Sequence, residues 1–88
     1  VDKLFFSSQG VHLDRGISES NELQARLKQK MVSIADRVIL LADASKFGQQ
    51  AFTHVVNLSQ VSEIITDSRL SDPIRSQLAE LAIPVTVV

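Results

Sequence analysis

The sequence contains no cysteine and only two histidines, His12 and His54, which lie far apart. Without cysteine the chain has neither a disulfide framework nor a thiolate metal site. Two histidines without a close partner also lack the spacing of a zinc site. We therefore expect no metal ion and no cofactor, and we interpret both histidines as surface residues.

A basic surface is also missing. The sequence has nine lysines and arginines and ten aspartates and glutamates, which gives a net charge of −1. A protein that binds DNA by itself carries a basic stripe that neutralises phosphates. Any contact with DNA must therefore lie outside these residues. Since no basic cluster interleaves with them, we expect the phenylalanines to belong to the core and not to a nucleic-acid stacking surface: Phe5, Phe6, Phe47 and Phe52.

Long apolar runs are absent too. The sequence has no apolar run of the ~20 residues that span a bilayer, and no segment of the kind that forms a secretion signal. A hydrophobic fraction of 44% with 22% charged residues is typical of a soluble globular chain. We expect a cytoplasmic protein with no membrane partner. Because the sequence enters a strand almost directly at 1–5, we also expect it to be a domain cut from a longer chain.

The central feature that is present is 38–48, VILLADASKFG. Its first five residues carry no charge and no alternation, which predicts a strand buried on both faces of a parallel sheet. Asp43, Ser45 and Lys46 follow where that strand should end. Ligands of open α/β sheets bind outside the carboxyl ends of the strands, so this segment is the first candidate for a binding site.

The residues before it predict a strand over Leu4–Ser8 and a loop over Gln9–Ser20, with a tight bend at Asp14-Arg15-Gly16. From Asn21 the apolar period becomes helical, which predicts an amphipathic helix packed on a sheet, with Ser20 as its N-cap. The apolar positions of this helix are Leu23, Leu27, Met31, Ile34, Ala35 and Val38.

The residues after it predict a short helical turn within 47–57, a brief strand at Val55-Val56 and a buried strand at Val61–Thr66. Asp72-Pro73 predicts the start of a second helix, and the β-branched residues 85–88 a last strand. Strands alternating with helices imply an α/β layer fold with a parallel sheet and right-handed crossovers. A partial sheet exposes edges or faces unless a second copy covers them, so we expect a homo-oligomer.

The ordered set Asp2-Lys3-Leu4-Phe5, Gly10, Gly16, Asn21-Glu22, Lys30-Met31, Asp43-Ala44-Ser45-Lys46-Phe47 and Ile64-Ile65-Thr66-Asp67 resembles the effector-binding domain of DeoR-type bacterial transcription regulators. Such regulators pair an amino-terminal winged helix-turn-helix with a domain similar in fold to ribose-5-phosphate isomerase. The resemblance implies a three-layer, parallel-sheet α/β partial domain, with residues 1–88 as the carboxyl-terminal part of the sensing domain. It also implies that the winged helix and the glycine-rich phosphate-binding loop lie outside this chain.

The function implied is a sensor of phosphorylated sugars that controls a carbohydrate-utilisation operon, as repressor or activator, with a fucose-type operon among the candidates. Catalysis is not expected. Phe6 and Gln9 stand where the isomerases resemble D-G-A-D-E with two aspartates, and neither side chain can act as the general base that sugar isomerisation needs. The alternatives are a sugar-phosphate isomerase on the same scaffold and a purely structural dimerisation module.

Each candidate ligand residue also has a structural interpretation. Lys46 matches the lysine of an isomerase-like D-x-S-K motif and would bind phosphate as a point charge, or it is a solvated lysine. Asp43 would orient Lys46 or a sugar hydroxyl, or cap the turn, and Ser45 would cap in the same way. The remaining candidates contact the ligand or serve as an ordinary turn, a solvated arginine and a helix cap: Ser8, Gln9, Gly10, Arg15 and Asn21. For Lys30 a solvated position is the favoured interpretation.

Overall fold

A computed structural model describes residues 2–49, 51 and 53–88. In chain order the elements are β1 (Lys3–Ser7), β2 (Gly10–His12), β3 (Gly16–Glu19), α1 (Glu22–Ile34), β4 (Arg37–Leu41), the 3-10 turn η1 (Ala44–Lys46), β5 (Thr53–Val56), the 3-10 turn η2 (Leu58–Gln60), β6 (Glu63–Thr66), α2 (Asp72–Glu80) and β7 (Val85–Val87). Neither helix is long and apolar enough to cross a membrane, as far as the described residues go.

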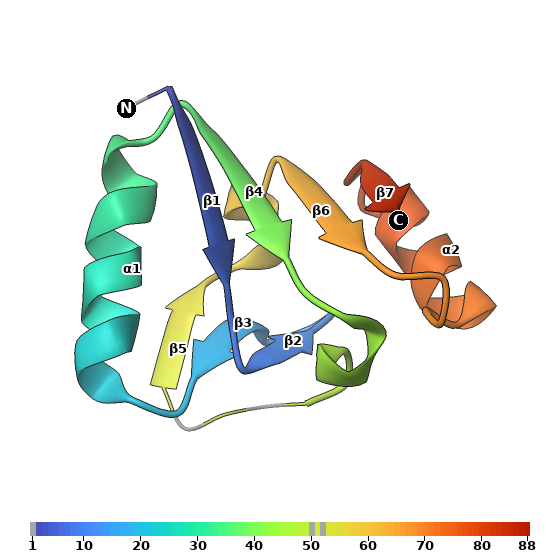
Figure 1. Cartoon of the computed structure of the whole chain (residues 1–88), viewed down its shortest axis with the longest axis horizontal. Helices are drawn as coiled ribbons and strands as arrows, with labels where there is room; N and C mark the ends of the chain where they lie inside the picture. Colours follow the sequence, from blue (N-terminus) through green and yellow to red (C-terminus); the bar gives the residue numbers. More distant parts are fainter. Residues whose placement is uncertain (1, 50, 52) are drawn as a thin grey trace.

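The strands form two sheets. β1, β4, β6 and β7 make a parallel sheet in that order, and β2, β3 and β5 make an antiparallel one. The helices α1 and α2 lie at opposite ends of the long axis, with the parallel strands between them (Figure 1). The predicted mixed α/β fold with a parallel sheet is therefore confirmed.

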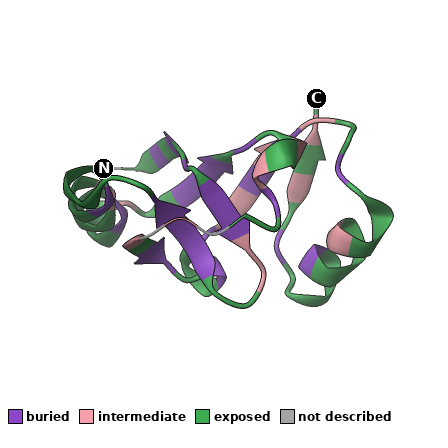
Figure 2. Ribbon diagram, turned by 90° about the horizontal axis from the view of Figure 1, so that it is seen from below, coloured by how far each residue is buried: buried purple, intermediate pink, exposed green. Residues whose placement is uncertain are grey.

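The core lies between the two sheets and the helices. β1 alternates between exposed and buried residues, which predicts one inward face, whereas the middle three residues of β4, Val38–Leu40, are all buried. Figure 2 shows the buried residues concentrated on the strands, while both helices are largely exposed. The bulkiest side chains with almost no solvent contact come from both sheets and from α2: Val11, Ile17, Leu40, Ile64 and Leu78.

The predicted loop over Gln9–Ser20 is wrong, because β2 and β3 form a hairpin there. Its strands have three and four residues, too short to show alternation, yet the hairpin buries Val11 and Ile17 completely. The bend at Asp14–Gly16 is confirmed. Gly16 has φ +84°, a left-handed conformation that glycine adopts without steric cost.

Later elements follow the sequence more closely. The strand at Val55-Val56 is confirmed within β5, while the helical turn occurs earlier than expected, at Ala44–Lys46. Asp72 and Pro73 begin α2 as predicted. Phe6 and Phe47 are in the core, Phe5 is exposed against expectation, and Phe52 lies outside the described residues.

The prediction for α1 is wrong in two respects. Asn21, and not Ser20, is the N-cap, because its Oδ1 accepts the Gln24 backbone N–H at 3.1 Å. The predicted apolar face does not pack on a sheet: Ala25 and Val32 pack against β5 and β3, and Leu23, Leu27, Met31 and Ile34 are exposed. The helix packs mainly on the small sheet, while Leu27 and Met31 line a hollow together with Phe5 and Leu41 of the parallel sheet.

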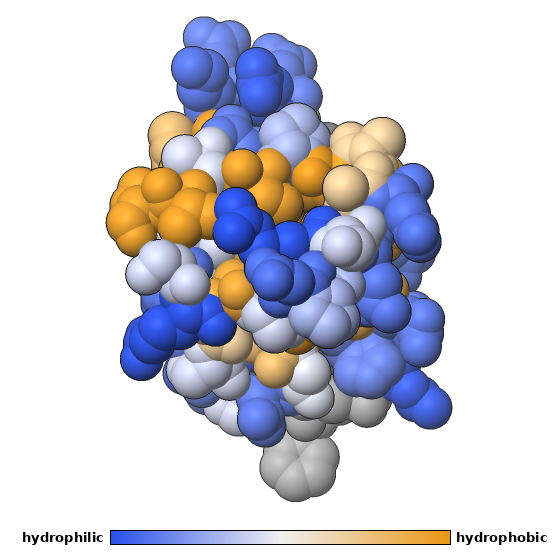
Figure 3. All heavy atoms as spheres, turned by 90° about the vertical axis from the view of Figure 1, so that its right-hand side faces the viewer, coloured by the Kyte–Doolittle hydropathy of each residue, from blue (hydrophilic) through white to orange (hydrophobic). Residues whose placement is uncertain are grey.

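Apolar side chains are also exposed at the other end of the molecule, where Leu81 follows α2 and Val88 follows β7. Figure 3 shows this side, on which apolar patches are separated by hydrophilic residues. Scattered exposed apolar residues of this kind are normal on a soluble protein.

Candidate functional site

The carboxyl end of β4 is closed by hydrogen bonds within the segment Asp43–Lys46. The Asp43 carboxylate accepts the backbone N–H of Ser45 at 2.9 Å and also the Ser45 hydroxyl. The Lys46 backbone N–H donates to the Asp43 carbonyl at 3.1 Å, which forms the 3-10 turn η1. Asp43 is therefore the N-cap of the turn, whereas Ser45 supports that cap with its hydroxyl and caps no backbone group itself. The half-buried Lys46 lies at the end of the turn.

A second group, from the end of β6, joins this turn. Asp67 Oδ2 accepts the Ala44 backbone N–H at 3.2 Å, which ties the two strand ends together. The Arg69 guanidinium donates two hydrogen bonds to the same carboxylate, at 3.2 Å and 2.9 Å. Arg69 was missed in the sequence, although Asp67 ends a predicted strand just as Asp43 does. We name Asp43, Ser45, Lys46, Asp67 and Arg69 the strand-end cluster.

The cluster keeps its carboxylates ionised. Hydrogen bonding by the Arg69 side chain, supported by the backbone N–H groups of Arg69 and Ala44, holds the pKa of Asp67 far below its usual range. The hydrogen bond from the Ser45 hydroxyl lowers the pKa of Asp43 although desolvation raises it, and the Ser45 backbone N–H and the charges of Lys46 and Arg69 lower it further. Both cations therefore lie close enough to Asp43 to influence it, so two positive and two negative charges meet at one sheet edge.

The turn after β1 holds three other predicted residues. Ser8 is buried and its hydroxyl donates to the Gly10 carbonyl at 3.4 Å, while the Gln9 backbone N–H donates to Ser18 at 3.2 Å. A Cβ on Gly10 would lie 2.6 Å from the Gln49 carbonyl oxygen, so glycine is needed there for close packing. Among these three, Gln9 has the exposed side chain.

The last two predicted ligand residues, Asn21 and Arg15, lie on other elements. Asn21 caps α1, as the structural interpretation predicted. Arg15 lies at the tip of the β2–β3 hairpin, where its backbone N–H donates to His12 Nδ1 at 3.2 Å. Arg15 also lines a polar hollow of about 330 Å³ with His54 and Asn57. A ligand role for these residues stays a prediction.

A buried ion pair was also missed in the sequence. The Lys28 ammonium contacts the Glu19 carboxylate, and it donates to the Ser7 carbonyl at the end of β1. Both side chains are largely excluded from solvent, so the pair fastens α1 to β3 and β1. Lys30, which the sequence pattern matched, is exposed. The two partners lie on different elements, and no local pattern could have paired them.

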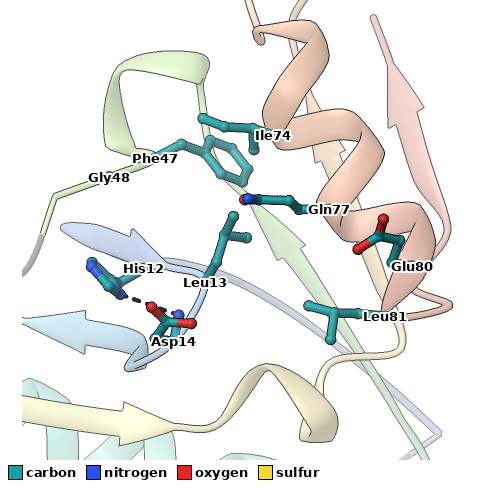
Figure 4. Close-up of a pocket in the computed structure, with 9 residues that line it drawn as sticks. All are labelled: His12, Leu13, Asp14, Phe47, Gly48, Ile74, Gln77, Glu80 and Leu81. Atoms are coloured by element: carbon teal, nitrogen blue, oxygen red, sulfur yellow. Dashed lines mark hydrogen bonds between the residues drawn. The ribbon is translucent and has the colours of Figure 1, made fainter.

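A groove of about 460 Å³ lies between the β2–β3 turn and α2. Figure 4 shows Leu13, Phe47 and Ile74 pointing toward one another with Gln77 between them. Its lining includes none of the predicted ligand residues. Asp43 and Asp67 instead line a shallow hollow of about 320 Å³ at the ends of β4 and β6. Neither Ser8 nor Lys46 lines any of these hollows or the two beside α1, so among the described residues the turn after β1 and the strand-end cluster share none of them.

In the described part of the chain, no three histidine, aspartate or glutamate side chains are grouped to hold a metal ion. For an anion or a hydroxylated ligand, the strand-end cluster contains a lysine ammonium, a guanidinium, a serine hydroxyl and two carboxylate acceptors.

Comparison with known proteins identifies the relationship. Residues 1–68 match the family described as the DeoR C terminal sensor domain. The chain belongs to the DeoR family. It is 42% identical over 88 residues to the HTH-type transcriptional regulator YulB of Bacillus subtilis, covering 100% of this chain and 34% of YulB. This confirms the resemblance inferred from the sequence motifs.

Other DeoR-type relatives extend the comparison. The HTH-type transcriptional regulator GlpR of Haloferax volcanii is 32% identical over 84 residues, covering 96% of this chain and 33% of that protein. The L-fucose operon activator of Haemophilus influenzae is 40% identical over 67 residues, covering 76% and 27%. The chain thus spans about a third of the length of the curated relatives it matches.

Proposed function

We propose that residues 1–88 form the carboxyl-terminal part of the effector-sensing domain of a bacterial regulator of carbohydrate use, and that a phosphorylated sugar binds at the strand-end cluster. In this proposal the complete domain has the three-layer architecture of ribose-5-phosphate isomerase. The family assignment and the operon named for the Haemophilus influenzae relative support a sugar-derived effector.

The observation that carries the proposal is the junction of two strand ends at the Ala44–Asp67 hydrogen bond. It places Lys46 and Arg69 at the edge of the sheet where ligands of α/β proteins bind. Lys46 would hold the phosphate as a point charge, because its side chain makes no hydrogen bond to the described residues, whereas Arg69 is engaged by Asp67. The carboxylates of Asp43 and Asp67 would accept hydrogen bonds from sugar hydroxyls.

The proposed role is regulatory and not catalytic. Phe6 points into the core and Gln9 is a neutral amide, so neither supplies the base of an isomerase. The effector would act by binding one arrangement of the subunits of a homo-oligomer more tightly than another, since a ligand shifts an equilibrium only by its differential affinity. DNA would be contacted by a winged helix on another segment.

The test is calorimetric titration of the chain with glucose 6-phosphate, fructose 1-phosphate, ribose 5-phosphate and fuculose 1-phosphate, each beside the free sugar and inorganic phosphate. We expect at least one sugar phosphate to bind, and Lys46→Ala to weaken it at least tenfold. Lys30→Ala is the matched control, since Lys30 is an exposed lysine on α1, and it should leave affinity unchanged. The proposal is contradicted if every sugar phosphate is silent, or if both variants bind as the parent does.

A further inference from the structure

The groove between the β2–β3 turn and α2 has the size and the lining of a small-molecule site. Such sites are mostly apolar hollows of about 300–1,000 Å³ with a few polar groups that orient the ligand, and this groove has about 460 Å³. Leu13 comes from the turn, Phe47 from the end of η1, and Ile74 and Leu81 from α2 and its end. Since Leu13, Phe47 and Ile74 point toward one another (Figure 4), they present a continuous apolar surface to a ligand.

The charged groups that line the groove are both acidic. Asp14 on the turn and Glu80 on α2 are exposed, and neither carboxylate forms an ion pair with the described residues. His12 Nδ1 accepts the backbone N–H groups of Asp14 and Arg15, each at 3.2 Å, so this nitrogen carries no proton and the ring is neutral. Arg15 lines the polar hollow and not this groove. The groove therefore has two negative charges and no positive charge among its described lining residues.

One wall of the groove lies outside the region that matches the family. Residues 1–68 match the DeoR C terminal sensor domain, whereas the α2 side of the groove follows residue 68: Ile74, Gln77, Glu80 and Leu81. The groove is thus built partly from residues beyond the matched region, and it is separate from the strand-end cluster.

The groove nevertheless adjoins the segment that carries Lys46. Phe47 and Gly48 follow Lys46 directly and line the groove. The Phe47 backbone N–H donates to the Ala44 carbonyl at 3.3 Å, and the Gly48 N–H donates to the Val11 carbonyl at 2.8 Å. A molecule in the groove therefore contacts the end of η1 from the side opposite to its start at Asp43.

We propose that the groove is a second ligand site, which binds a small organic cation with an apolar body and an ammonium group. The apolar body lies on Leu13, Phe47 and Ile74, and the ammonium lies between the carboxylates of Asp14 and Glu80. Opposite charges attract within a few ångströms, and an anion of the same shape is repelled by both carboxylates. The side-chain amide of Gln77 lies beside the apolar residues in Figure 4 and can donate to or accept from a polar atom of the ligand. This site goes beyond the proposed function and does not depend on it.

The test is an NMR titration of the ¹⁵N-labelled 88-residue chain at pH 7 with three probes. Tryptamine combines an apolar ring system with an ammonium group. Indole-3-propionate has the same ring system and a carboxylate in place of the ammonium, and ethylamine has the ammonium without the ring. We expect tryptamine to shift the backbone amide signals of residues 12–14, 47–48 and 74–81 in a saturable manner, and the other two probes to bind at least tenfold more weakly.

Three substitutions locate the bound ammonium. Asp14→Asn and Glu80→Gln each remove one carboxylate charge, and each should weaken tryptamine about threefold, as expected for an exposed ion pair. Asp36→Asn is the matched control, because Asp36 is also exposed and forms no ion pair with the described residues, and it lies between α1 and β4 at the other end of the molecule (Figure 1). It should leave the affinity unchanged. An equal loss in all three variants would assign the binding to net charge and overturn the proposal.

The probes themselves also give results that would overturn the proposal. Tryptamine shifts that do not saturate, or indole-3-propionate binding as tightly as tryptamine, would do so. Tryptamine shifts confined to residues 43–45 and 65–67 would place the cation on Asp43 and Asp67 instead. Groove signals that move when the chain is diluted without any probe would assign the groove to a second copy. Acetyl-leucyl-lysine amide binding at least tenfold more tightly than tryptamine would assign it to a polypeptide partner.

No sugar phosphate is present in this experiment, so its outcome is separate from that of the proposed function. Failure of tryptamine to bind would contradict the second site and leave the effector site at the strand-end cluster untouched. Saturable binding in the groove with every sugar phosphate silent would contradict the proposed function alone.

Discussion

At the scale of single residues, the polar side chains at the strand ends form hydrogen bonds with nearby backbone groups. Asp43 caps a turn, Asp67 accepts the Ala44 N–H, and Ser8 donates to the Gly10 carbonyl. The sequence already suggested the capping alternative for Asp43, because aspartate hydrogen-bonds its own backbone two residues on. The contact of Arg69 with Asp67 joins residues only two apart, and the sequence pattern gave no sign of it. That Arg69 also acts on Asp43 could not be predicted, because it depends on the pairing of β4 with β6.

The Asp67–Arg69 pair gives a pH prediction. Hydrogen bonding by the Arg69 side chain lowers the pKa of Asp67 in the folded state below the value of about 3.9 expected in the unfolded chain. The pair therefore contributes its stability above about pH 4, and the contribution is lost as pH falls through the lowered pKa of the folded state. Carboxyl chemical shifts followed by NMR from pH 6 to 2 should show Asp67 still ionised when an ordinary exposed aspartate has titrated.

The control for this prediction is Arg69→Ala, which should return the pKa of Asp67 toward the ordinary range, leaving only the contributions of the backbone N–H groups of residue 69 and Ala44. If Asp67 titrates at the same pH with and without the guanidinium, Arg69 is not the cause of the shift.

At the scale of elements, long sequence patterns predict the structure better than short ones. β4 and β6 are predicted because runs rich in β-branched residues end in aspartate, and α2 because an Asp-Pro start precedes spaced apolar residues. The predicted burial of β4 on both faces holds for Val38–Leu40 but is wrong for Leu41, which is 39% exposed. The β2–β3 hairpin was missed because three- and four-residue strands are shorter than the alternation that reveals a strand. The orientation of α1 was wrong because its larger residues point outward, while the small Ala25 and a single valine make the inward contact.

The start of α1 can be tested by two alanine substitutions. Asn21→Ala removes the side-chain acceptor of the Gln24 N–H and should lower the free energy of unfolding by about 1 kcal/mol. Ser20→Ala should change it far less, because the structure gives Ser20 no capping role. Urea unfolding followed by far-ultraviolet circular dichroism measures both. A larger loss for Ser20→Ala would restore the N-cap predicted from the sequence.

The link between α1, β3 and β1 can be tested at Glu19. Glu19→Gln leaves the largely buried Lys28 ammonium without its counter-charge, and we expect a loss of about 3 kcal/mol, near the lower end for broken buried pairs. Glu22→Gln is the matched control, since its pair with Arg26 is exposed and worth under about 1 kcal/mol. Equal losses in urea unfolding would show that burial does not distinguish the two pairs.

At the scale of the whole molecule, one face of the parallel sheet packs on the small sheet and the helices, whereas on the other face Phe5 and Leu41 are exposed and Ile39 is buried. The composition predicted a soluble α/β chain, and the order of strands and helices predicted the parallel sheet, because both depend on patterns spread over the full length. Which face stays open could not be predicted, since it depends on the small sheet and α1 lying on the same side. The strand-end cluster lies at the carboxyl edge of this sheet, so its access to a ligand depends on what covers the open face.

The most direct test of the central claim is an NMR map of the ¹⁵N-labelled chain with the sugar phosphate that binds best in calorimetry. We predict that the backbone amide signals of residues 43–46 and 67–69 shift in a saturable manner, and that Lys46→Ala abolishes the shifts while Lys30→Ala does not. Shifts confined to the Arg15–His54 hollow or to the groove between Leu13 and α2, with residues 43–46 and 67–69 unmoved, would contradict the assignment of the effector site to the strand-end cluster.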